Sequence, residues 1–404
     1  MANPDTTEPI VLDGSVLEGG GQILRNAVAL SALLHKPITI EKIRYGRSSP
    51  GLRNQHRTGL ELAARIASAE LLNAKNGSTS ITFKPGSLVV PGEYIADAVT
   101  AGAVTLMLQI SLPLLLFSSS IEGGRSTLTL RGGTNAIQAP QIDYVQHVFL
   151  PFVQRHFGVG SVDVNLTRRG YYPKGGGEVV FSLPSLPPGE KLKSFSLLQR
   201  GKLVSIKGIA HFSKLPGSVG SEMVRGAEKY LRKAGYRGKE ENDMLPPNSD
   251  DEDEEDDGAV KIEIKAVREK NDISVAGGSG IVLWAELEGG GFIGGSAVGK
   301  KGIDPQQVGA EAAELLVKGL EGGGCVDEWL QDQIIIFMAL ADGSSEVRCA
   351  RGELELHTKT AIWLAEQLTD AKFTIEADPA GTIIRCQGIG YSASPHQSER
   401  NAED

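Results

Sequence analysis

A chain of 404 residues is too long for one ordinary hydrophobic core, so two or more domains are expected. Its hydrophobic content of 40% is sufficient for globular folding, and its 50 glycines follow no collagen-like period. The formal net charge of -9 is carried almost entirely by eight consecutive acids at 250–257. The rest of the chain is close to neutral, so its charge does not exclude a nucleic-acid ligand.

The sequence argues against secretion and against a membrane span. The chain starts without a signal-peptide pattern, and its cysteines have neither a paired number nor metal-ligand spacing, so a reducing intracellular compartment is expected. The mostly apolar stretch 98–117 contains Gly, Gln and Pro and has no Lys or Arg on either immediate side, which predicts a buried helix followed by a strand. The cysteines are Cys325, Cys349 and Cys386.

A glycine-rich stretch near the N-terminus is a candidate phosphate loop. We expect a disordered leader at 1–9 and a short strand at 10–12. Glu18-Gly19-Gly20-Gly21 then precedes the apolar helical stripe of residues 22–34. Glycines before a helix let backbone N–H groups approach an anion, although a flexible turn explains the same pattern equally well.

An arginine-rich stretch follows the predicted strand 38–43. Residues 44–57 hold four arginines and His56 around a Pro-Gly turn, just before a helix predicted at 55–73. Forked guanidinium groups suit bidentate contacts with phosphate. A solvated basic face is the alternative, but the interleaved glycines and the strand-to-helix junction favour an anion site.

The next elements repeat one order: strand, glycine-rich turn, helix, strand. This repetition predicts an α+β fold assembled from similar units. The predicted strands are 80–83, 125–130, 162–166 and 178–183, the helices are 97–107 and 139–157, and the glycine-rich turns are 131–135 and 168–177.

The Pro-rich stretch 183–189 marks a candidate domain boundary. We predict a small inserted domain at 189–295, with strands at 203–212, 260–267 and 281–287 and an amphipathic helix at 219–234. Eight adjacent carboxylates repel one another, so the acidic loop 240–258 is predicted to be disordered. The large domain then comprises 10–188 and 296–392, with a disordered tail at 393–404.

Residues 294–301 have the spacing of a Walker A loop, but Lys301 stands where Ser or Thr should hold magnesium. We therefore reject a P-loop. Asp304-Pro305 matches the start of a helix, with Asp304 as the N-cap and Pro305 at the first helical position.

On a later helix, Trp329, Asp332 and Gln333 share one face. Such a face could bind a base and ribose, but without other support it is an ordinary amphipathic helix end.

His357 is the candidate nucleophile. Residues 354–356 alternate like a half-buried strand, and 358–367 read as a helix, so His357 is predicted at the junction. The free N–H groups and dipole of a helix N-terminus favour a phosphate there. Taken alone, the pattern is more typical of a packing or surface histidine.

These residues together resemble the RNA 3′-terminal phosphate cyclase family over nearly the whole chain. The most specific segments occur in the family's order: Glu18-Gly19-Gly20-Gly21-Gln22-Ile23-Leu24-Arg25, residues 44–56, Gly132-Gly133-Thr134-Asn135, Tyr172-Pro173-Lys174-Gly175-Gly176-Gly177, Asp332-Gln333 and Leu356-His357-Thr358.

The resemblance implies an α+β fold, with a large enolpyruvyl-transferase-like domain and a smaller inserted α/β domain. It also implies that the protein uses ATP and Mg²⁺ (or Mn²⁺) to convert an RNA 3′-phosphate end into a 2′,3′-cyclic phosphodiester. The expected intermediates are an adenylylated histidine and an RNA adenylate. We expect a nuclear, alternatively cytoplasmic, protein with no membrane contact and no obligate protein partner.

The resemblance also implies roles for individual residues. His357 is the expected nucleophile, and Glu18 the expected metal ligand. The expected phosphate-facing residues are Arg25, Arg44, Arg47, Gln55 and His56, and the expected nucleotide-binding residues are Gln109, Pro140, Trp329, Asp332 and Gln333. Trp329 replaces the family's more usual tyrosine, so stacking on adenine is retained while any hydroxyl contact is lost.

Two alternatives share the architecture. One is the non-catalytic cyclase-like ribosome-assembly branch, which lacks the nucleophilic histidine and part of the phosphate-facing set. The other is an enolpyruvyl transferase. The presence of His357, Arg25, Arg47 and His56 favours the enzyme.

Overall fold

The computed structural model describes residues 8–120, 122–238 and 259–394, and it contains one supersecondary unit in three copies. In each copy, two strands pair in parallel across a helix, and a second helix leads into an antiparallel hairpin that extends the sheet. The resulting sheet orders are β1-β2-β4-β3, β5-β6-β8-β7 and β9-β15-β17-β16. The repeated strand–helix architecture expected from the sequence is confirmed.

The first unit comprises β1 (Ile10–Asp13), α1 (Gly21–Leu34), β2 (Ile38–Glu41), α2 (Asn54–Ile66), β3 (Glu70–Leu72) and β4 (Ile81–Lys84). The second comprises β5 (Glu93–Asp97), α3 (Val104–Leu115), β6 (Gly124–Gly132), α4 (Ile142–Tyr144), the π-helical turn Val145–Phe149, α5 (Leu150–Phe157), β7 (Asp163–Arg168) and β8 (Gly177–Ser185). The third comprises β9 (Ser196–Leu197), α9 (Glu328–Leu340), β15 (Ser344–Cys349), α10 (Leu356–Leu368), β16 (Lys372–Asp378) and β17 (Gly381–Gln387).

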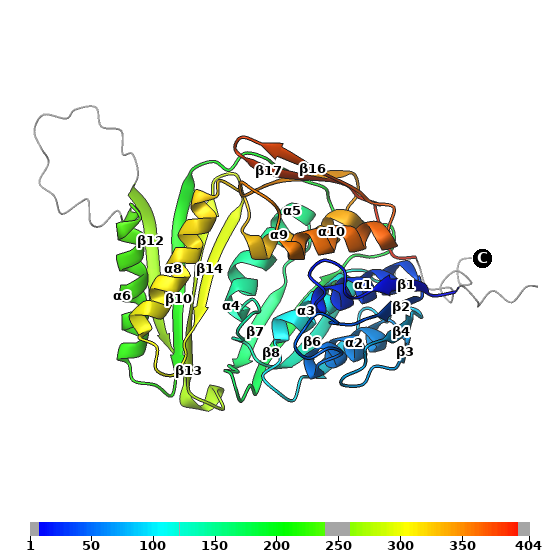
Figure 1. Cartoon of the computed structure of the whole chain (residues 1–404), viewed down its shortest axis with the longest axis horizontal. Coiled ribbons are helices and arrows are strands. Elements are labelled where there is room, and N and C mark those ends of the chain that lie inside the picture. Colours follow the sequence, from blue (N-terminus) through cyan, green and yellow to red (C-terminus); the bar gives the residue numbers. More distant parts are fainter. Residues whose placement is uncertain (1–7, 121, 239–258, 395–404) are drawn as a thin grey trace, which may run out of the picture.

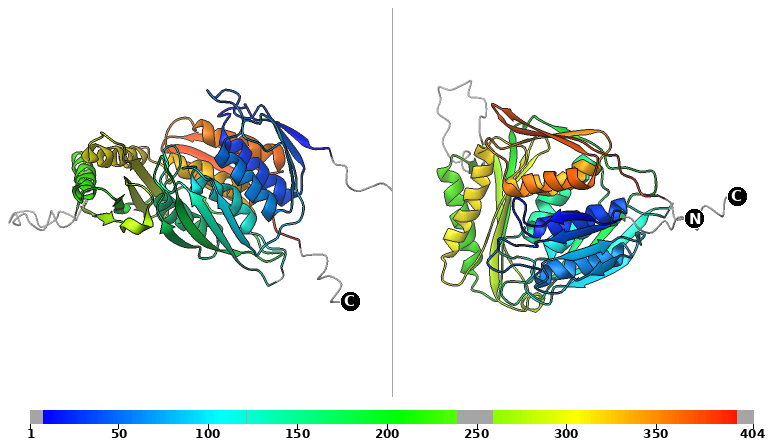
Figure 2. Two further views of the ribbon diagram at one scale, coloured as in Figure 1. Left: turned by 90° about the horizontal axis from the view of Figure 1, so that it is seen from below. Right: turned by 45° about the vertical axis from the view of Figure 1, so that its right-hand side comes forward.

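The helices lie in the interior and the three sheets surround them (Figures 1 and 2). Helices α1, α3 and α9 are buried on most of their surface, because their apolar residues are not confined to one stripe. Strand β8 alternates buried and half-buried residues, which is the pattern of a sheet with one covered face. All three units contribute to one hydrophobic core.

The inserted unit interrupts the third copy between β9 and α9. It comprises β10 (Leu203–Ser213), α6 (Ser218–Lys233), β11 (Arg237–Gly238), β12 (Ala259–Arg268), the 3-10 helix Asn271–Ile273, β13 (Gly278–Leu287), β14 (Phe292–Val298) and α8 (Pro305–Glu321). Helices α6 and α8 cover the outer face of the sheet β11-β12-β10-β13-β14 and form a second core with it (Figure 1).

This arrangement places the insert differently from the predicted range of 189–295. Strand β9 still pairs with β15 of the large domain, while β14 and α8 pack within the insert. The apolar stripe of α8 did not reveal which core it joins. The predicted acidic loop 240–258, and most of the predicted leader and tail, lie outside the described residues.

Several predicted element boundaries were wrong. Residues 354–355 are not a strand, and α10 begins at Leu356, so His357 lies in the first helical turn. Helix α2 ends at Ile66 because Ser68 takes a left-handed backbone conformation that turns the chain into β3. Helix α3 starts after β5 and runs to Leu115, two residues past Pro113, which lacks the N–H that would bond to the carbonyl of Gln109.

Other details agree with the sequence. The Walker-like segment begins inside β14, so its rejection as a P-loop is confirmed. The Asp304 carboxylate accepts a hydrogen bond from Gln306 N at 2.9 Å and caps α8. Each described helix is too short or too polar to cross a bilayer.

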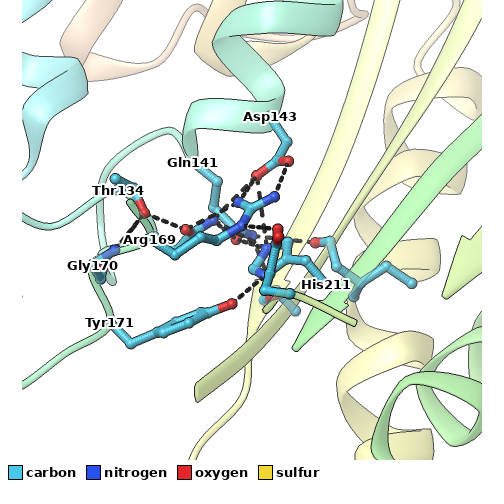
Figure 3. Close-up of polar contacts among 11 residues, drawn as sticks. Thr134, Gln141, Asp143, Arg169, Gly170, Tyr171 and His211 are labelled. Carbon is cyan, nitrogen blue, oxygen red and sulfur yellow. Dashed lines mark hydrogen bonds and ion pairs between the residues drawn. The ribbon is translucent and has the colours of Figure 1, made fainter. Parts of the chain in front are cut away.

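A buried polar network joins the insert to the second unit (Figure 3). Arg169, which follows β7, donates two hydrogen bonds to Asp143 of α4, at 2.6 and 2.8 Å, and a third to Glu269 at 2.6 Å. Burial alone would raise the pKa of Asp143, but the Arg169 guanidinium holds that pKa far below its usual range. The pair is therefore a buried ion pair with its hydrogen bonds satisfied.

His211 on β10 completes the network. Its Nδ1 lies 2.9 Å from Tyr171 Oη, and its Nε2 lies 3.1 Å from both Gln141 Oε1 and Asn135 Nδ2. Burial, followed by the charge of Arg169, lowers the pKa of His211 to about 3, so the ring is neutral. Two glycine-rich motifs, at 132–135 and 172–177, border this joint.

Replacing Arg169 with Ala should leave Asp143 as an uncompensated buried charge. We expect the free energy of unfolding to fall by about 3–5 kcal/mol, measured by urea denaturation. Arg225→Ala removes an exposed ion pair with Glu222 and should cost less than about 1 kcal/mol. Equal effects of the two changes would contradict a stabilising role for the buried pair.

His211 should make folding sensitive to acid. Its pKa is about 3 when folded and about 6.5 when unfolded, so between these values the unfolded chain binds the extra proton. Stability should therefore fall as pH drops below 6.5, by up to about 1.4 kcal/mol per pH unit from this residue. His211→Asn should flatten the slope between pH 6 and 4 by that amount, whereas His35→Asn, at an exposed position, should not.

Candidate active site

The described residues enclose a cleft of about 520 Å³ at the centre of the large domain. Its walls come from the N-terminal ends of α1, α2, α3, α9 and α10, from the loop between β2 and α2, and from the segment before α4. The sequence-predicted site residues all line it: Glu18, Arg25, Arg44, Arg47, Gln55, His56, Gln109, Pro140, Trp329, Asp332, Gln333 and His357. The fold thus brings together residues up to 339 positions apart in the chain, as the span from Glu18 to His357 shows.

The glycine-rich turn and α1 form one wall. A Cβ added to Gly21 would lie 2.7 Å from His56 Nε2 and 3.0 Å from an Arg25 guanidinium nitrogen, so a larger residue would displace these two side chains. Glu18 N donates a hydrogen bond of 3.2 Å to Thr360 Oγ1, which ties this turn to α10. The close approach aligns the start of α1 with the nucleophile candidate.

Two ionic atoms in this wall are left without partners. Arg25 Nε and Glu18 Oε2 are buried and have no hydrogen-bond partner among the described residues. Burial lowers the pKa of Arg25, while the charges of Asp332 and Glu18 oppose the shift. A guanidinium stays cationic in proteins, so Arg25 offers an unused donor to an anion in the cleft.

The loop between β2 and α2 supplies further positive charge. Arg44 has a left-handed backbone conformation and donates to the carbonyl oxygens of Ser49 and Gly51, at 2.9 and 3.0 Å, which fixes the loop around its own side chain. Arg47 forms an ion pair with the Glu18 carboxylate. The loop is therefore a structured part of the site rather than a solvated basic face.

His56 lies in the first turn of α2 and is oriented by the backbone. Its Nδ1 accepts a hydrogen bond of 3.2 Å from Arg53 N, so the proton is on Nε2, which faces Gly21 and Arg25. Burial, followed by the charges of Arg25, Arg44 and Arg53, lowers the pKa of His56 to about 3. The ring is a neutral N–H donor at physiological pH.

Amide side chains form another wall of the cleft. Gln109 Nε2 donates to Gln333 Oε1 at 3.0 Å, and Gln333 Nε2 donates to the carbonyl oxygen of Trp329. The Pro140 carbonyl accepts a hydrogen bond of 2.8 Å from Thr105. The half-buried Trp329 ring lies 6.1 Å from Tyr144, so this side combines an aromatic plane with ordered amides.

The contacts of His357 define which ring nitrogen is free. Its Nδ1 lies 3.2 Å from Gln22 Oε1, and Gln22 Nε2 donates to Asp332 Oδ2 at 2.8 Å. Because the amide oxygen can only accept, Nδ1 carries the proton and Nε2 keeps its lone pair. Burial raises the pKa of Asp332 to about 7, against the opposing charge of Arg25.

A family model described as RNA 3′-terminal phosphate cyclase matches residues 16–375. The chain belongs to the RNA 3′-terminal phosphate cyclase family. Curated relatives match this chain over most of their lengths. The RNA 3′-terminal phosphate cyclase of Pyrobaculum neutrophilum is 37% identical, covering 94% of this chain and 99% of the relative. That of Drosophila melanogaster is 36% identical, covering 96% and 98%, and the probable cyclase of Dictyostelium discoideum is 36% identical, covering 95% and 83%.

The side chains of the cleft suit a Mg²⁺ ion that takes most of its ligands from substrate phosphates and water. No group of three or more His, Cys, Asp or Glu side chains that could hold a metal ion occurs in the part of the chain that the structure describes. Glu18, however, has one carboxylate oxygen free. Mg²⁺ commonly binds through one or two carboxylates together with substrate phosphates and water, and Glu18 suits that arrangement in a cyclase-family cleft.

The sequence prediction missed several residues of this cleft. Gln22 and Arg53 lie within the family segments but received no individual role. The side-chain contacts of Gln22 are with Asp332 and His357, which are distant in sequence. Gly20 and Gly21 belong to the glycine-rich stretch that the sequence offered as a phosphate loop, whereas the other lining residues carry no local signal for a site: Leu106, Gln138, Glu328 and Glu355.

Arg25 should dominate anion binding in the cleft. Removing its guanidinium in Arg25→Ala deletes a charge-assisted contact of about 1.5–3 kcal/mol, so affinity for inorganic tripolyphosphate should fall roughly 10- to 150-fold in calorimetry. Arg125→Ala, on the outer sheet and paired with Asp163, is the matched control and should leave affinity unchanged. Unchanged binding in Arg25→Ala would show that the anion does not reach this guanidinium.

Proposed function

We propose that this protein uses ATP to convert an RNA 3′-terminal phosphate into a 2′,3′-cyclic phosphodiester, with His357 as the covalent carrier of AMP. The observation that carries the proposal is the free Nε2 of His357, whose ring lines a cleft that also contains Arg25, Arg44 and Arg47. Family membership supports the same activity, because the relatives described above are named RNA 3′-terminal phosphate cyclases.

In the first step, His357 Nε2 attacks the α-phosphorus of ATP. The new P–N bond forms as the bond from the α-phosphorus to the bridging oxygen breaks, and pyrophosphate leaves with that electron pair. The proton stays on His357 Nδ1, hydrogen-bonded to Gln22 Oε1, during the attack, so the lone pair of Nε2 needs no external base to act as a nucleophile.

In the second step, an oxygen of the RNA 3′-phosphate attacks the AMP phosphorus and releases His357 Nε2. The 2′-hydroxyl then attacks the RNA 3′-phosphorus and displaces AMP, which closes the cyclic phosphodiester. Splitting the condensation in this way activates a poor leaving group through two displacements at phosphorus.

The positive groups stabilise charge that develops on the phosphate oxygens. Arg25, Arg44 and Arg47 would donate to the polyphosphate, while the neutral His56 and Gln55 would add hydrogen bonds without further charge. Mg²⁺ or Mn²⁺ bound at Glu18 would neutralise part of the polyphosphate charge.

The wall of amide side chains would hold the nucleoside. Trp329 offers a plane on which adenine can stack. Gln109 and Gln333 are already ordered by their mutual hydrogen bond, and Pro140 and Asp332 complete this wall. Binding the base here would leave the α-phosphate facing α10 and His357.

Incubation with ATP labelled at the α-phosphate should leave an acid-labile, alkali-stable label on the protein. The label should be absent in His357→Ala and retained in His35→Ala, a change at the exposed histidine that caps the C-terminal end of α1. RNA with a 3′-phosphate should discharge the label, whereas the same RNA with a 3′-hydroxyl should not. A folded wild-type protein that acquires no label would refute the proposed chemistry.

A further inference from the structure

A chain of hydrogen bonds connects the nucleophile candidate to a buried carboxylate through one amide. His357 of α10, Gln22 of α1 and Asp332 of α9 meet at the centre of the cleft, with donor–acceptor distances of 3.2 Å and 2.8 Å. Each residue comes from a different helix, and 335 positions separate Gln22 from His357. The amide of Gln22 links the imidazole of His357 to the carboxyl group of Asp332.

Two features fix the orientation of the Gln22 amide. Its side chain is almost fully buried, at 4% exposure, so it is held by packing. The ionised carboxylate of Asp332 can only accept hydrogen bonds, so it selects the NH₂ side of the amide and turns the carbonyl oxygen towards His357. Because the pKa of Asp332 is raised to about 7, this ionised form predominates above neutral pH. A carbonyl oxygen then requires a proton on Nδ1, which leaves Nε2 unprotonated in the neutral ring.

We propose that Gln22 is a positioning residue that sets the tautomer and the orientation of the His357 imidazole, and that Asp332 acts on the nucleophile through Gln22. This inference rests on the proposed function of His357 and extends it to residues that do not touch the phosphate. It gives Asp332 a role towards the nucleophile in addition to any contact with the nucleoside.

Neighbouring contacts hold the three helices in the required geometry. Thr358 Oγ1 donates to Gln331 Oε1 at 2.9 Å, which joins the start of α10 to α9. Thr360 Oγ1 accepts from Glu18 N, which joins the same turn to the loop before α1. With the backbone fixed on both sides, the ring of His357 retains rotation about its side-chain bonds, and that rotation is what the Gln22 contact restrains.

An amide suits this task better than a carboxylate. A carboxylate beside Nδ1 would favour the imidazolium, in which Nε2 is protonated and cannot attack phosphorus. The Gln22 carbonyl orients the same N–H without adding a negative charge next to the ring. Asp332 supplies its charge one amide further away, where it orders Gln22.

Gln22→Met tests the inference, because methionine keeps a similar volume and cannot accept from Nδ1 or donate to Asp332. We expect the rate of AMP transfer to the protein to fall at least tenfold at saturating ATP. Affinity for an ATP analogue with a methylene group between the α- and β-phosphates should change less than threefold. Asn26→Met, one turn along α1, controls for a general disturbance of the helix.

The tautomer can be read directly by ¹⁵N NMR of histidine-labelled protein, with His357 assigned by its loss in His357→Ala. The wild type should show a protonated Nδ1 and an unprotonated Nε2, and Gln22→Met should show a mixture of tautomers. Gln22→Asn, which is too short to bridge both partners, should behave like Gln22→Met and serves as the second variant if methionine prevents folding.

The outcomes distinguish failure of the proposed function from failure of the positioning role. If the wild type forms no AMP adduct, the proposed function fails. If the wild type forms the adduct and the Gln22 variants match it in transfer rate and tautomer, only the positioning role is overturned. Loss of transfer together with equal loss of analogue affinity would assign Gln22 to ATP binding and would also overturn the inference.

Discussion

The structure depends on the convergence of helix N-termini from all three repeats on one cleft. Each N-terminus presents N–H groups without intrahelical partners and the positive end of a helix dipole. The glycine turn before α1, the His56 turn of α2 and the His357 turn of α10 all lie there. The arginines add positive charge, so the cleft suits a multiply charged anion although the protein body is close to neutral.

The insert takes part in shaping the cleft although it contributes no residue to the phosphate wall. Asp327 caps α9, accepts hydrogen bonds from Trp329 N and Leu330 N, and also accepts from Gly294 N of β14 at 2.6 Å. Tyr144 Oη donates to the same carboxylate at 2.7 Å. The start of α9, and with it Trp329, is therefore held by the insert and the second repeat together. The Arg169–Asp143 pair and His211 form a second set of contacts between the insert and the second repeat.

Local chemistry made much of the site predictable. Glycines before a helix, clustered arginines and a carboxylate–amide face are signals within a few residues, and the fold places all of them in one cleft. Gln22 could not be assigned in this way, because its role comes from partners on two other helices. The insert boundary failed for a related reason: β14 and α8 are ordinary amphipathic elements whose core is decided by tertiary packing. The segment before His357 was misjudged because three alternating residues do not distinguish a strand from a helix start.

The position of the insert also affects the order in which the chain can fold. Strand β9 has two residues and pairs in parallel with β15, and Ser196 and Glu346, which are 150 positions apart, share a hydrogen bond of 2.7 Å. During synthesis β9 emerges long before its partner, so the third sheet can be completed only after the insert has closed the intervening loop. The first two repeats have no such delay. Because β9 has only two residues, it presents few unpaired backbone groups to other strands before β15 is synthesised.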